Sequence, residues 1–189
     1  MIIGLAGHKG AGKTTIAKFL EGHGFYHVMF ADKIKQALNL IFGFGGSGWN
    51  DAEWKETPHE AAYGRTPRQL AQTLGTNWGR HMVHSDIWVD ATMRPALSYL
   101  RMTPSSSLVI SDVRFENEAR AIRKAGGYIL ILERLGYVPT DGHSSEAGIE
   151  ALPGDVLLHG ADGDVEGLKQ LTLKVLDALR ARELEAKAK

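Results

Sequence analysis

The chain has 189 residues, no cysteine, and equal numbers of basic and acidic side chains, 22 of each. A hydrophobic content of 43% is ordinary for a globular enzyme, and the balanced charge gives no reason to expect a surface that binds nucleic acid. The absence of cysteine excludes disulfides and thiolate metal sites, and no apolar run is long enough to span a bilayer, so we expect a cytoplasmic protein without membrane contacts.

A glycine-rich loop near the N-terminus fits the pattern G-x-x-x-x-G-K-[ST]. It lies between the apolar run 1–6, which predicts a buried strand, and a segment with helical spacing of apolar residues. Glycines allow close backbone approach to phosphate oxygens, and the loop N–H groups and helix N-terminus attract the anion. We therefore expect a nucleoside triphosphate here, with Lys13 at the β- and γ-phosphates and Thr14 on Mg²⁺. The expected donor-binding residues are Gly7, Lys9, Gly10, Ala11, Gly12, Lys13, Thr14 and Thr15.

A second strand is predicted over residues 25–31 and an amphipathic helix over 32–42. Asp32 suits the N-cap of that helix, but its place after a strand equally suits a ligand at the carboxyl edge of a parallel sheet. The glycine-rich stretch 43–64 predicts a mobile loop with exposed aromatic side chains.

The next segments have helical patterns. One helix starts at Thr66, with Pro67 in its first turn, and carries Leu70, Leu74 and Trp78 at intervals of four residues. Another is predicted over 86–99, bent near Pro95. Residues 43–101 therefore predict a mainly helical insertion.

Three more strands are predicted in the last part of the chain. The run 108–112 ends on Asp112, which is the Walker B pattern, and is followed by a helix; the other strands cover 128–133 and 156–159. A final helix starts near residue 165, and we expect the tail 183–189 to fray. The pattern predicts one α/β domain over 1–189, with a core of 1–42 and 102–182 and a five-stranded parallel sheet covered by helices on both faces.

Sequence features narrow the chemistry at the phosphate site. No N-K-x-D motif follows the loop, which argues against a GTPase. Asp112 is followed by Val113 and Arg114 and not by the second acid of an ATP-driven motor, which argues against that class. Arginines bind phosphate oxygens with two parallel hydrogen bonds, so a set of them suits two phosphorylated ligands. These arginines are Arg65, Arg68, Arg80, Arg114 and Arg134.

The chain resembles the bacteriophage deoxynucleoside monophosphate kinases, within the P-loop nucleoside monophosphate kinase superfamily. The resemblance is carried by the glycine-rich loop and by the blocks at 30–35 (FADKIK), 64–70 (GRTPRQL), 74–80 (LGTNWGR), 86–89 (DIWV), 111–119 (SDVRFENEA) and 143–146 (HSSE). It implies a P-loop kinase fold and the conversion of a deoxynucleoside monophosphate to its diphosphate, with ATP as donor and Mg²⁺ as cofactor. Small-molecule nucleotides are then the partners, and the host cytoplasm is the location if a phage encodes the chain.

The resemblance also implies roles for residues. Lys13, Asp112, Arg114 and Arg134 would be catalytic; Thr14 and Asp112 would serve the metal, and the two arginines would bridge donor and acceptor phosphates. Residues 134–147 fall where such enzymes place a closing lid. We expect the acceptor site between the core sheet and the helical insertion. Its candidate residues are Asp32, Lys35, Arg65, Arg68, Gln72, Trp78, Arg80 and Glu146, with Trp49, Trp54, Tyr63 and Trp88 as further flat surfaces for a base.

Two other hypotheses for the function remain open at this point. One is a P-loop kinase for another phosphorylated acceptor, such as dephospho-coenzyme A or phosphomevalonate. The other is a nucleotide-binding module without catalysis. The base, the choice between ribose and deoxyribose, and the formation of a homodimer are not decided by the sequence.

Overall fold

The computed structural model describes residues 1–134, 149–161 and 163–188. By their contacts the residues form two compact units, one made of Met1–Val28 with Ala96–Lys189 and the other of Met29–Pro95. The sequence analysis had placed these boundaries after residues 42 and 101. The predicted lid-like loop, apart from Arg134, lies outside the described residues. Across the described residues no helix is both long and apolar enough to cross a membrane.

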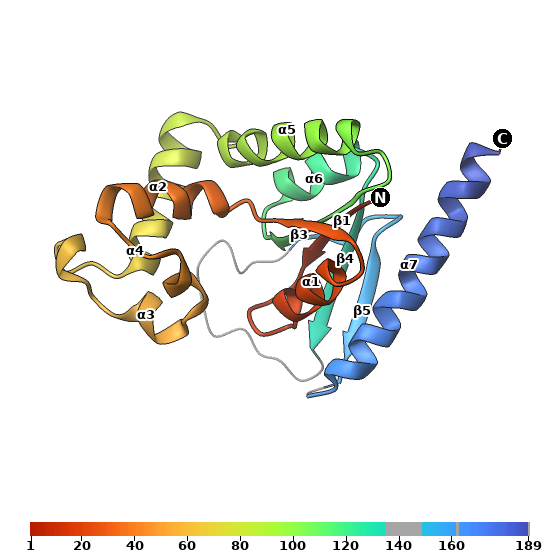
Figure 1. The fold of residues 1–189 in the computed structure, drawn as a ribbon, viewed down its shortest axis with the longest axis horizontal. Coiled ribbons are helices and arrows are strands. Elements are labelled where there is room, and N and C mark those ends of the chain that lie inside the picture. The colour runs from red at the N-terminus through yellow and green to blue at the C-terminus, as the bar shows by residue number, and fades with distance from the viewer. Residues whose placement is uncertain (135–148, 162, 189) are drawn as a thin grey trace. The chain divides into compact units, whose positions relative to one another are not determined.

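The first unit is built on a five-stranded sheet (Figure 1). Its strands are β1 (Ile2–Ala6), β2 (Phe25–Val28), β3 (Ser107–Val113), β4 (Tyr128–Arg134) and β5 (Val156–Gly160). The spatial order is β2-β3-β1-β4-β5, and every neighbouring pair is parallel. This confirms the predicted α/β class. Because all strands run the same way, the residues after β1, β3 and β4 meet at one edge of the sheet.

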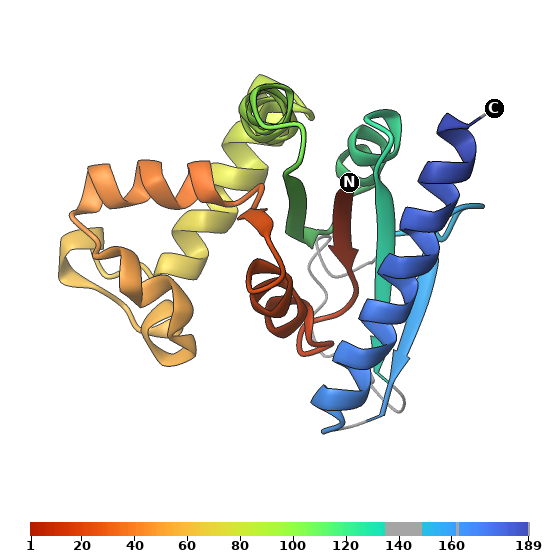
Figure 2. The same cartoon turned by 45° about the vertical axis from the view of Figure 1, so that its right-hand side comes forward.

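Helices cover both faces of this sheet (Figure 2). Helices α1 (Lys13–Glu21) and α7 (Val165–Lys187) contact each other and the sheet, whereas α6 (Glu116–Lys124) packs on β1 and β4. Side chains alternate along a strand, so the fully buried Ile3 and Leu5 join the core under α1 and α7. Gly4 faces α6, where an added Cβ would lie 2.7 Å from Ile122 Cδ1.

The last helix is longer than predicted. It begins with Asp164, whose carboxylate accepts a hydrogen bond of 2.8 Å from the Gly167 N–H, and continues to Lys187. The helix therefore includes most of the segment 183–189, in which a frayed tail was expected. Residues 181–187 are Ala, Arg, Glu, Leu and Lys, which have high helix propensity and give the helix no reason to stop.

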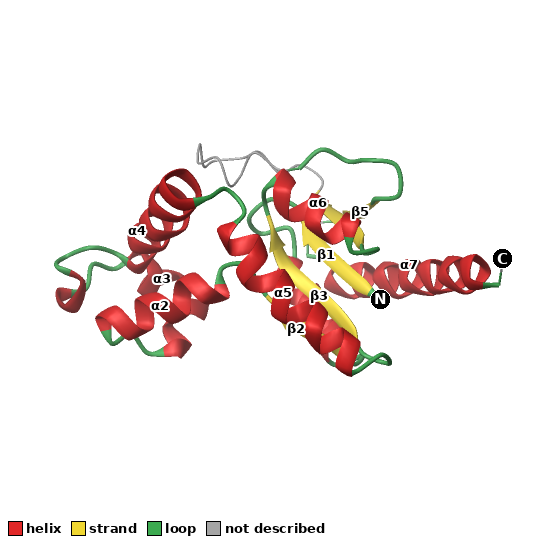
Figure 3. Ribbon diagram, turned by 90° about the horizontal axis from the view of Figure 1, so that it is seen from above, coloured by secondary structure: helices red, strands yellow, loops and turns green. Residues whose placement is uncertain are grey.

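The second unit is built from helical segments (Figure 3). They are α2 (Asp32–Phe42), α3 (Ala52–Glu56), α4 (Pro67–Gln72) and the part of α5 (Ile87–Met102) up to Pro95, with short 3₁₀ turns at Gly46–Asn50 and Glu60–Ala62. The predicted start of α4 is confirmed by a reciprocal cap. The Gln69 N–H donates to Thr66 Oγ1 and the Thr66 N–H donates to Gln69 Oε1, both at 3.1 Å.

The aromatic residues of segment 43–64 form a small core, which corrects the prediction of exposed rings. Trp49 is 8% exposed, and its indole N–H donates to Asn39 Oδ1 at 2.8 Å. Phe44 and Trp54 pack edge-on to Trp49 and to each other, with ring centroids 5.2–6.3 Å apart. Gly48 permits this packing because a Cβ there would overlap the Trp54 ring. Tyr63, by contrast, is 91% exposed, as predicted.

Between α4 and α5 the chain forms a π-helix over Thr73–Val83. Its wider turn is visible in the hydrogen bond from the His84 N–H to the Gly79 carbonyl, which spans five residues. The buried Trp88 explains the geometry, because its indole N–H donates to the Gly75 carbonyl at 2.7 Å and its ring leaves no room for a Cβ on Gly79. Trp88 therefore anchors this helix and offers no surface for a base.

An ion-pair cluster fixes α6 to the segment before β5. The Arg123 guanidinium donates to both oxygens of Asp155, at 3.1 and 2.6 Å, and to Glu116 Oε1 at 2.7 Å. The Asp155 side chain is only 3% exposed and also accepts from the Leu152 N–H at 2.8 Å. The hydrogen bond and charge of Asp155 raise the pKa of Arg123 against the opposing effect of its burial.

Replacing Arg123 with Ala should lower the free energy of unfolding by about 3 kcal/mol, because it leaves a buried carboxylate without its cation. Chemical denaturation measures this loss. Arg120→Ala, on the exposed side of the same helix, is the matched control and should change stability by less than about 0.5 kcal/mol. Equal effects for the two variants would contradict the role given to the Arg123–Asp155 pair.

Candidate active site

The glycine-rich loop has the backbone geometry that its sequence predicts. Gly7, Gly10 and Gly12 have φ values of 128°, 83° and 92°, which side chains disfavour. Gly7 is constrained further, because a Cβ there would overlap the backbone carbonyl oxygen of Leu132 in β4. α1 starts directly after Gly12, so its free N–H groups open onto the loop. The loop is therefore shaped as an anion cradle at the N-terminus of a helix.

Lys13 lies across this loop. Its ammonium group donates hydrogen bonds to the carbonyl oxygens of Gly7 and, at 2.7 Å, of His8. Thr14 and Thr15, in the first turn of α1, are exposed. The loop and the first turn of α1 thus carry the ammonium groups of Lys9 and Lys13 and two accessible hydroxyl groups where an incoming phosphate chain would contact them.

The carboxyl end of β3 lies next to the loop. Val113 pairs with Ala6, which places Arg114 beside the first glycine of the loop. The register slips between the pairs Gly4↔Ile110 and Ala6↔Val113, so β3 contains one extra residue in the stretch that holds Asp112. Bulges of this kind redirect side chains and are common beside active sites. Asp112 and Arg114 are both partly exposed.

Glu118 holds the turn after β3, a role that the sequence analysis missed. Its side chain is 2% exposed, and one carboxylate oxygen accepts hydrogen bonds from the N–H groups of Arg114 (2.8 Å) and Phe115 (3.1 Å). This contact satisfies backbone donors at the start of α6 and fixes the backbone of Arg114. A glutamate at the third position of a helix is a sequence signal that predicts a cap of the helix N-terminus.

His27, in the neighbouring strand β2, contacts the bulged part of β3 through Ser111. The His27 Nε2 atom is 2.6 Å from the hydroxyl oxygen of Ser111, and its Nδ1 atom is 3.2 Å from Glu21 Oε1 at the end of α1. Ser111 is buried and immediately precedes Asp112. The three side chains therefore connect α1 and β2 to the strand that carries Asp112.

Arg134 is the last residue of β4, where it pairs with Gly160 of β5. The parallel register puts its backbone at the same edge of the sheet as the glycine-rich loop and Arg114. Glu146 lies outside the described residues. Of the predicted catalytic residues, Lys13, Asp112, Arg114 and Arg134 thus all follow or end strands at this edge.

The second unit holds the predicted acceptor residues other than Glu146. Asp32 is not the N-cap of α2, which is Ala31; it is the first helical residue, and its carboxylate accepts from the Met29 N–H at 2.9 Å. The prediction was one residue off because Ala31 already has helical dihedral angles. Lys35 lies one turn later, and its Nζ atom is 4.0 Å from Asp32 Oδ1.

The predicted arginines of this unit have partners of their own. The Arg68 guanidinium donates to Glu56, and Arg80 donates to the Ser85 carbonyl at 3.2 Å. Arg65 is exposed, and its backbone pairs with that of His59. Trp78 is 44% exposed on the π-helix, whereas Gln72 is partly buried.

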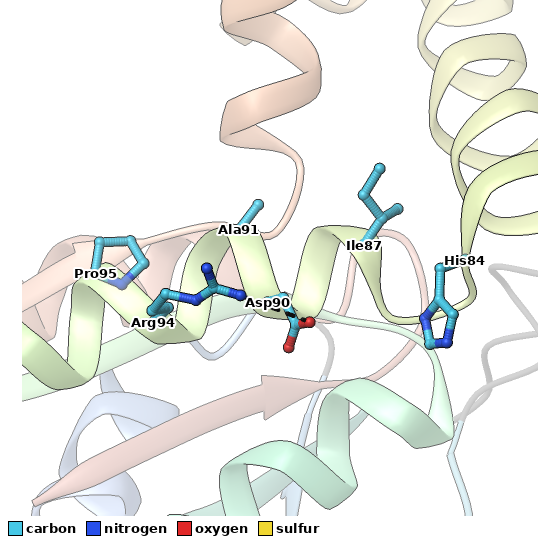
Figure 4. Close-up of a pocket in the computed structure, with 6 residues that line it drawn as sticks. All are labelled: His84, Ile87, Asp90, Ala91, Arg94 and Pro95. Carbon is cyan, nitrogen blue, oxygen red and sulfur yellow. Dashed lines mark ion pairs between the residues drawn. The ribbon is translucent and has the colours of Figure 1, made fainter.

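A hollow of about 520 Å³ runs along the part of α5 in this unit (Figure 4). It is lined by His84, Ile87, Asp90, Ala91, Arg94 and Pro95. Figure 4 shows Asp90 and Arg94 one turn apart on this helix. Arg94 Nη2 lies 4.0 Å from Asp90 Oδ2. The hollow offers a carboxylate, a guanidinium and an imidazole to a polar ligand, and the sequence analysis did not propose Asp90, Arg94 or His84 as site residues.

Comparisons with known proteins agree on one family. Residues 55–172 match the family model described as deoxynucleotide monophosphate kinase. A protein of Acanthamoeba polyphaga mimivirus, named "Putative deoxynucleotide monophosphate kinase", is 35% identical over 161 residues, which cover 80% of this chain and 83% of that protein. The deoxynucleoside-5'-monophosphate kinase of Escherichia phage T5 is 30% identical over 117 residues, covering 58% of this chain and 44% of the phage protein.

A solved structure shares the fold. A crystal structure titled as a "putative kinase" from Chloroflexus aurantiacus matches with a TM-score of 0.50 at 16% identity, covering 94% of this chain and 96% of that one. At this identity the match supports the architecture alone.

Replacing Gly7 with Ala should abolish binding of a nucleoside triphosphate and lower the free energy of unfolding by about 3 kcal/mol, because the new Cβ meets the Leu132 carbonyl. Gly24→Ala is the matched control. Gly24 also has a positive φ, 84°, but nothing lies within 4 Å of an added Cβ, so only a backbone strain of about 1 kcal/mol is expected. Calorimetric titration and denaturation test both variants; similar losses would contradict the steric argument.

Proposed function

From the fact that this chain belongs to the deoxynucleotide monophosphate kinase family, we propose that it transfers the γ-phosphoryl group of ATP to a deoxynucleoside monophosphate. The observation that carries the proposal is the shared sheet edge, where Lys13 crosses the glycine-rich loop and Arg114 follows the strand next to it. Phosphoryl transfer depends on positioning and on neutralising charge more than on covalent chemistry, and this edge supplies both. Since the relatives are viral, we infer that the chain works in the cytoplasm of an infected cell.

The residues at the loop fit ATP and Mg²⁺. Three glycines with positive φ and the N-terminus of α1 suit the phosphate chain. The exposed Thr14 hydroxyl and the carboxylate of Asp112 are oxygen ligands of the kind that Mg²⁺ prefers, together with phosphate and water oxygens. When bound, the metal would neutralise charge on the phosphate oxygens.

We assign separate roles in phosphoryl transfer to the side chains at this edge. The Lys13 ammonium exchanges the carbonyls of Gly7 and His8 for phosphate oxygens, where it balances charge on the transferred group. Arg114, held by Glu118 at its backbone, extends from the strand beside the loop, and Arg134 begins from the same edge. Both would bind oxygens of the donor and acceptor phosphates as bidentate hydrogen-bond donors.

For the acceptor we propose the second unit. Arg65, Arg68 and Arg80 supply guanidinium groups for its phosphate, although Arg68 must first release Glu56. The exposed Trp78 and the hollow along α5 offer an apolar face and polar groups to the base and sugar. Asp32, Lys35 and Gln72 remain candidates for contacts to the same ligand.

A panel of acceptors with ATP tests the function directly. The four deoxynucleoside monophosphates, the four ribonucleoside monophosphates, dephospho-coenzyme A and phosphomevalonate are assayed under identical conditions. We expect turnover with at least one deoxynucleoside monophosphate. Turnover only with dephospho-coenzyme A or phosphomevalonate would replace the acceptor class, and ATP binding without turnover on any acceptor would indicate a non-catalytic module.

Replacing Lys13 with Ala should lower kcat about a thousandfold, a loss of roughly 4 kcal/mol of transition-state stabilisation, with the fold intact. Steady-state kinetics and circular dichroism measure the two quantities. Lys124→Ala, an exposed lysine at the end of α6, serves as the control and should retain normal turnover. A Lys13 variant with near-normal kcat would remove Lys13 from the mechanism.

Replacing Arg114 or Arg134 with Lys should lower kcat by a larger factor than it raises KM, because a single ammonium group cannot replace a two-pronged donor in the transition state. Arg120→Lys, exposed on α6, is the control. If KM rises while kcat is unchanged, these arginines bind the ground state and the proposed role is wrong.

A further inference from the structure

The part of β3 that carries Asp112 interrupts the regular pairing of this strand with β1 and follows the end of its pairing with β2. Toward β1 the register slips after Ile110, so two residues of β3, Ser111 and Asp112, stand opposite one residue of β1. Toward β2 the pairing ends at Val28↔Ile110. A bulge disrupts the ladder of hydrogen bonds that fixes a strand, so contacts of another kind must hold the backbone of Asp112 in place.

The His27 side chain supplies such a contact from β2. Its backbone pairs with Val109, two residues before Ser111, and its ring reaches along β3 until Nε2 lies 2.6 Å from the Ser111 hydroxyl oxygen. Ser111 is only 5% exposed. A buried hydroxyl group that loses its partner is unfavourable, so this hydrogen bond resists any movement of Ser111 and of the residue that follows it.

Glu21, at the end of α1, orients the imidazole ring. His27 Nδ1 is 3.2 Å from Glu21 Oε1. An ionised carboxylate can only accept hydrogen bonds, so Nδ1 carries the hydrogen atom and Nε2 of the neutral ring is the acceptor for the Ser111 hydroxyl. The carboxylate thereby sets both the orientation and the tautomer of the ring. All the residues of this chain of contacts belong to the first unit.

We propose that His27 is a positioning residue for the binding of Mg²⁺, which acts through Ser111 on the backbone of Asp112. The inference rests on the proposed function only in that Asp112 serves the metal of a nucleoside triphosphate at the glycine-rich loop. With the His27–Ser111 bond in place, the Asp112 carboxylate is ordered before the metal arrives. Without that bond the bulge must be ordered during binding, which costs affinity. Contacts of this outer kind change metal affinity or activity by about 10- to 100-fold.

Titrating ATP calorimetrically in Mg²⁺ and in EDTA separates the metal from the phosphate cradle. The ratio of the two dissociation constants is the gain in ATP affinity that Mg²⁺ provides. His27→Phe keeps an aromatic ring and removes both hydrogen bonds. It should reduce this gain about tenfold and change ATP binding in EDTA by less than about twofold. Ser111→Ala should have the same effect, and the double variant should lose no more than either single variant.

A rescue variant and a control distinguish positioning from a general loss of structure. His27→Gln places an amide within reach of the Ser111 hydroxyl and should restore most of the gain. His23→Phe is the matched control, because His23 is exposed and its Nδ1 atom bonds to the Phe19 carbonyl of α1 at 2.8 Å. It should bind ATP as the wild type does in both buffers. A thermal melt shows whether each variant is folded, and Ser111→Ala with His27→Gln carries the test if His27→Phe is not.

Three outcomes would overturn the proposal. Equal weakening of ATP in Mg²⁺ and in EDTA would mean that His27 supports the loop and not the metal site. An unchanged gain in folded His27→Phe or in Ser111→Ala would mean that Asp112 is held without this contact. A wild-type chain that gains nothing from Mg²⁺ would remove the metal role of Asp112 itself. Because these titrations need no acceptor, a failed kinase assay together with the expected loss of the gain would remove the proposed function and leave the positioning role standing.

Discussion

The carbonyl oxygen of Leu132 occupies the space that a side chain at residue 7 would fill, and the phosphate-binding end of the molecule depends on this contact. Because residue 7 is a glycine, the chain that leaves β1 can pass directly over β4. The loop is thereby fixed to the strand that ends, two residues later, at Arg134. The pairing of Ala6 with Val113 fixes the other side of the loop to β3 in the same way. A cradle anchored to both neighbouring strands needs little reorganisation when an anion binds, which is the condition for effective electrostatic catalysis.

Local signals explain why much of this could be predicted. Strands buried on both faces are continuous apolar runs, and the glycine-rich loop has a fixed spacing between strand and helix, so the parallel sheet and the backbone geometry of the loop before Lys13 could be predicted from the sequence alone. The C-terminal end of α2 at Phe42 and the cap at Thr66 could also be predicted from the sequence. The order β2-β3-β1-β4-β5 was not, because strand neighbours are decided by contacts between distant segments.

Contacts between distant segments also explain the errors at the tryptophans and at His27. Trp49 and Trp88 looked available for a base, yet each is buried and donates its indole N–H to an acceptor supplied by another part of the fold. The pair His27–Ser111 joins residues 84 positions apart, and no spacing rule could have revealed it. Glu118 was missed for a different reason. Its capping position was readable, but acidic residues at the start of a helix are common and give no sign of which backbone they will bind.

The π-helix over Thr73–Val83 has a consequence for how the length of the chain can vary. Each π turn holds about one residue more than an α turn, so deleting a single residue there would convert a wide turn to a tight one without breaking the helix. Because the tightened turn still completes one full rotation, the residues beyond the deletion would keep nearly the same orientation around the axis. In a regular α-helix the same deletion would rotate every following residue by about 100°. A change of one residue in chain length can therefore be taken up within Thr73–Val83, provided that Gly75 and Gly79 keep their contacts with Trp88.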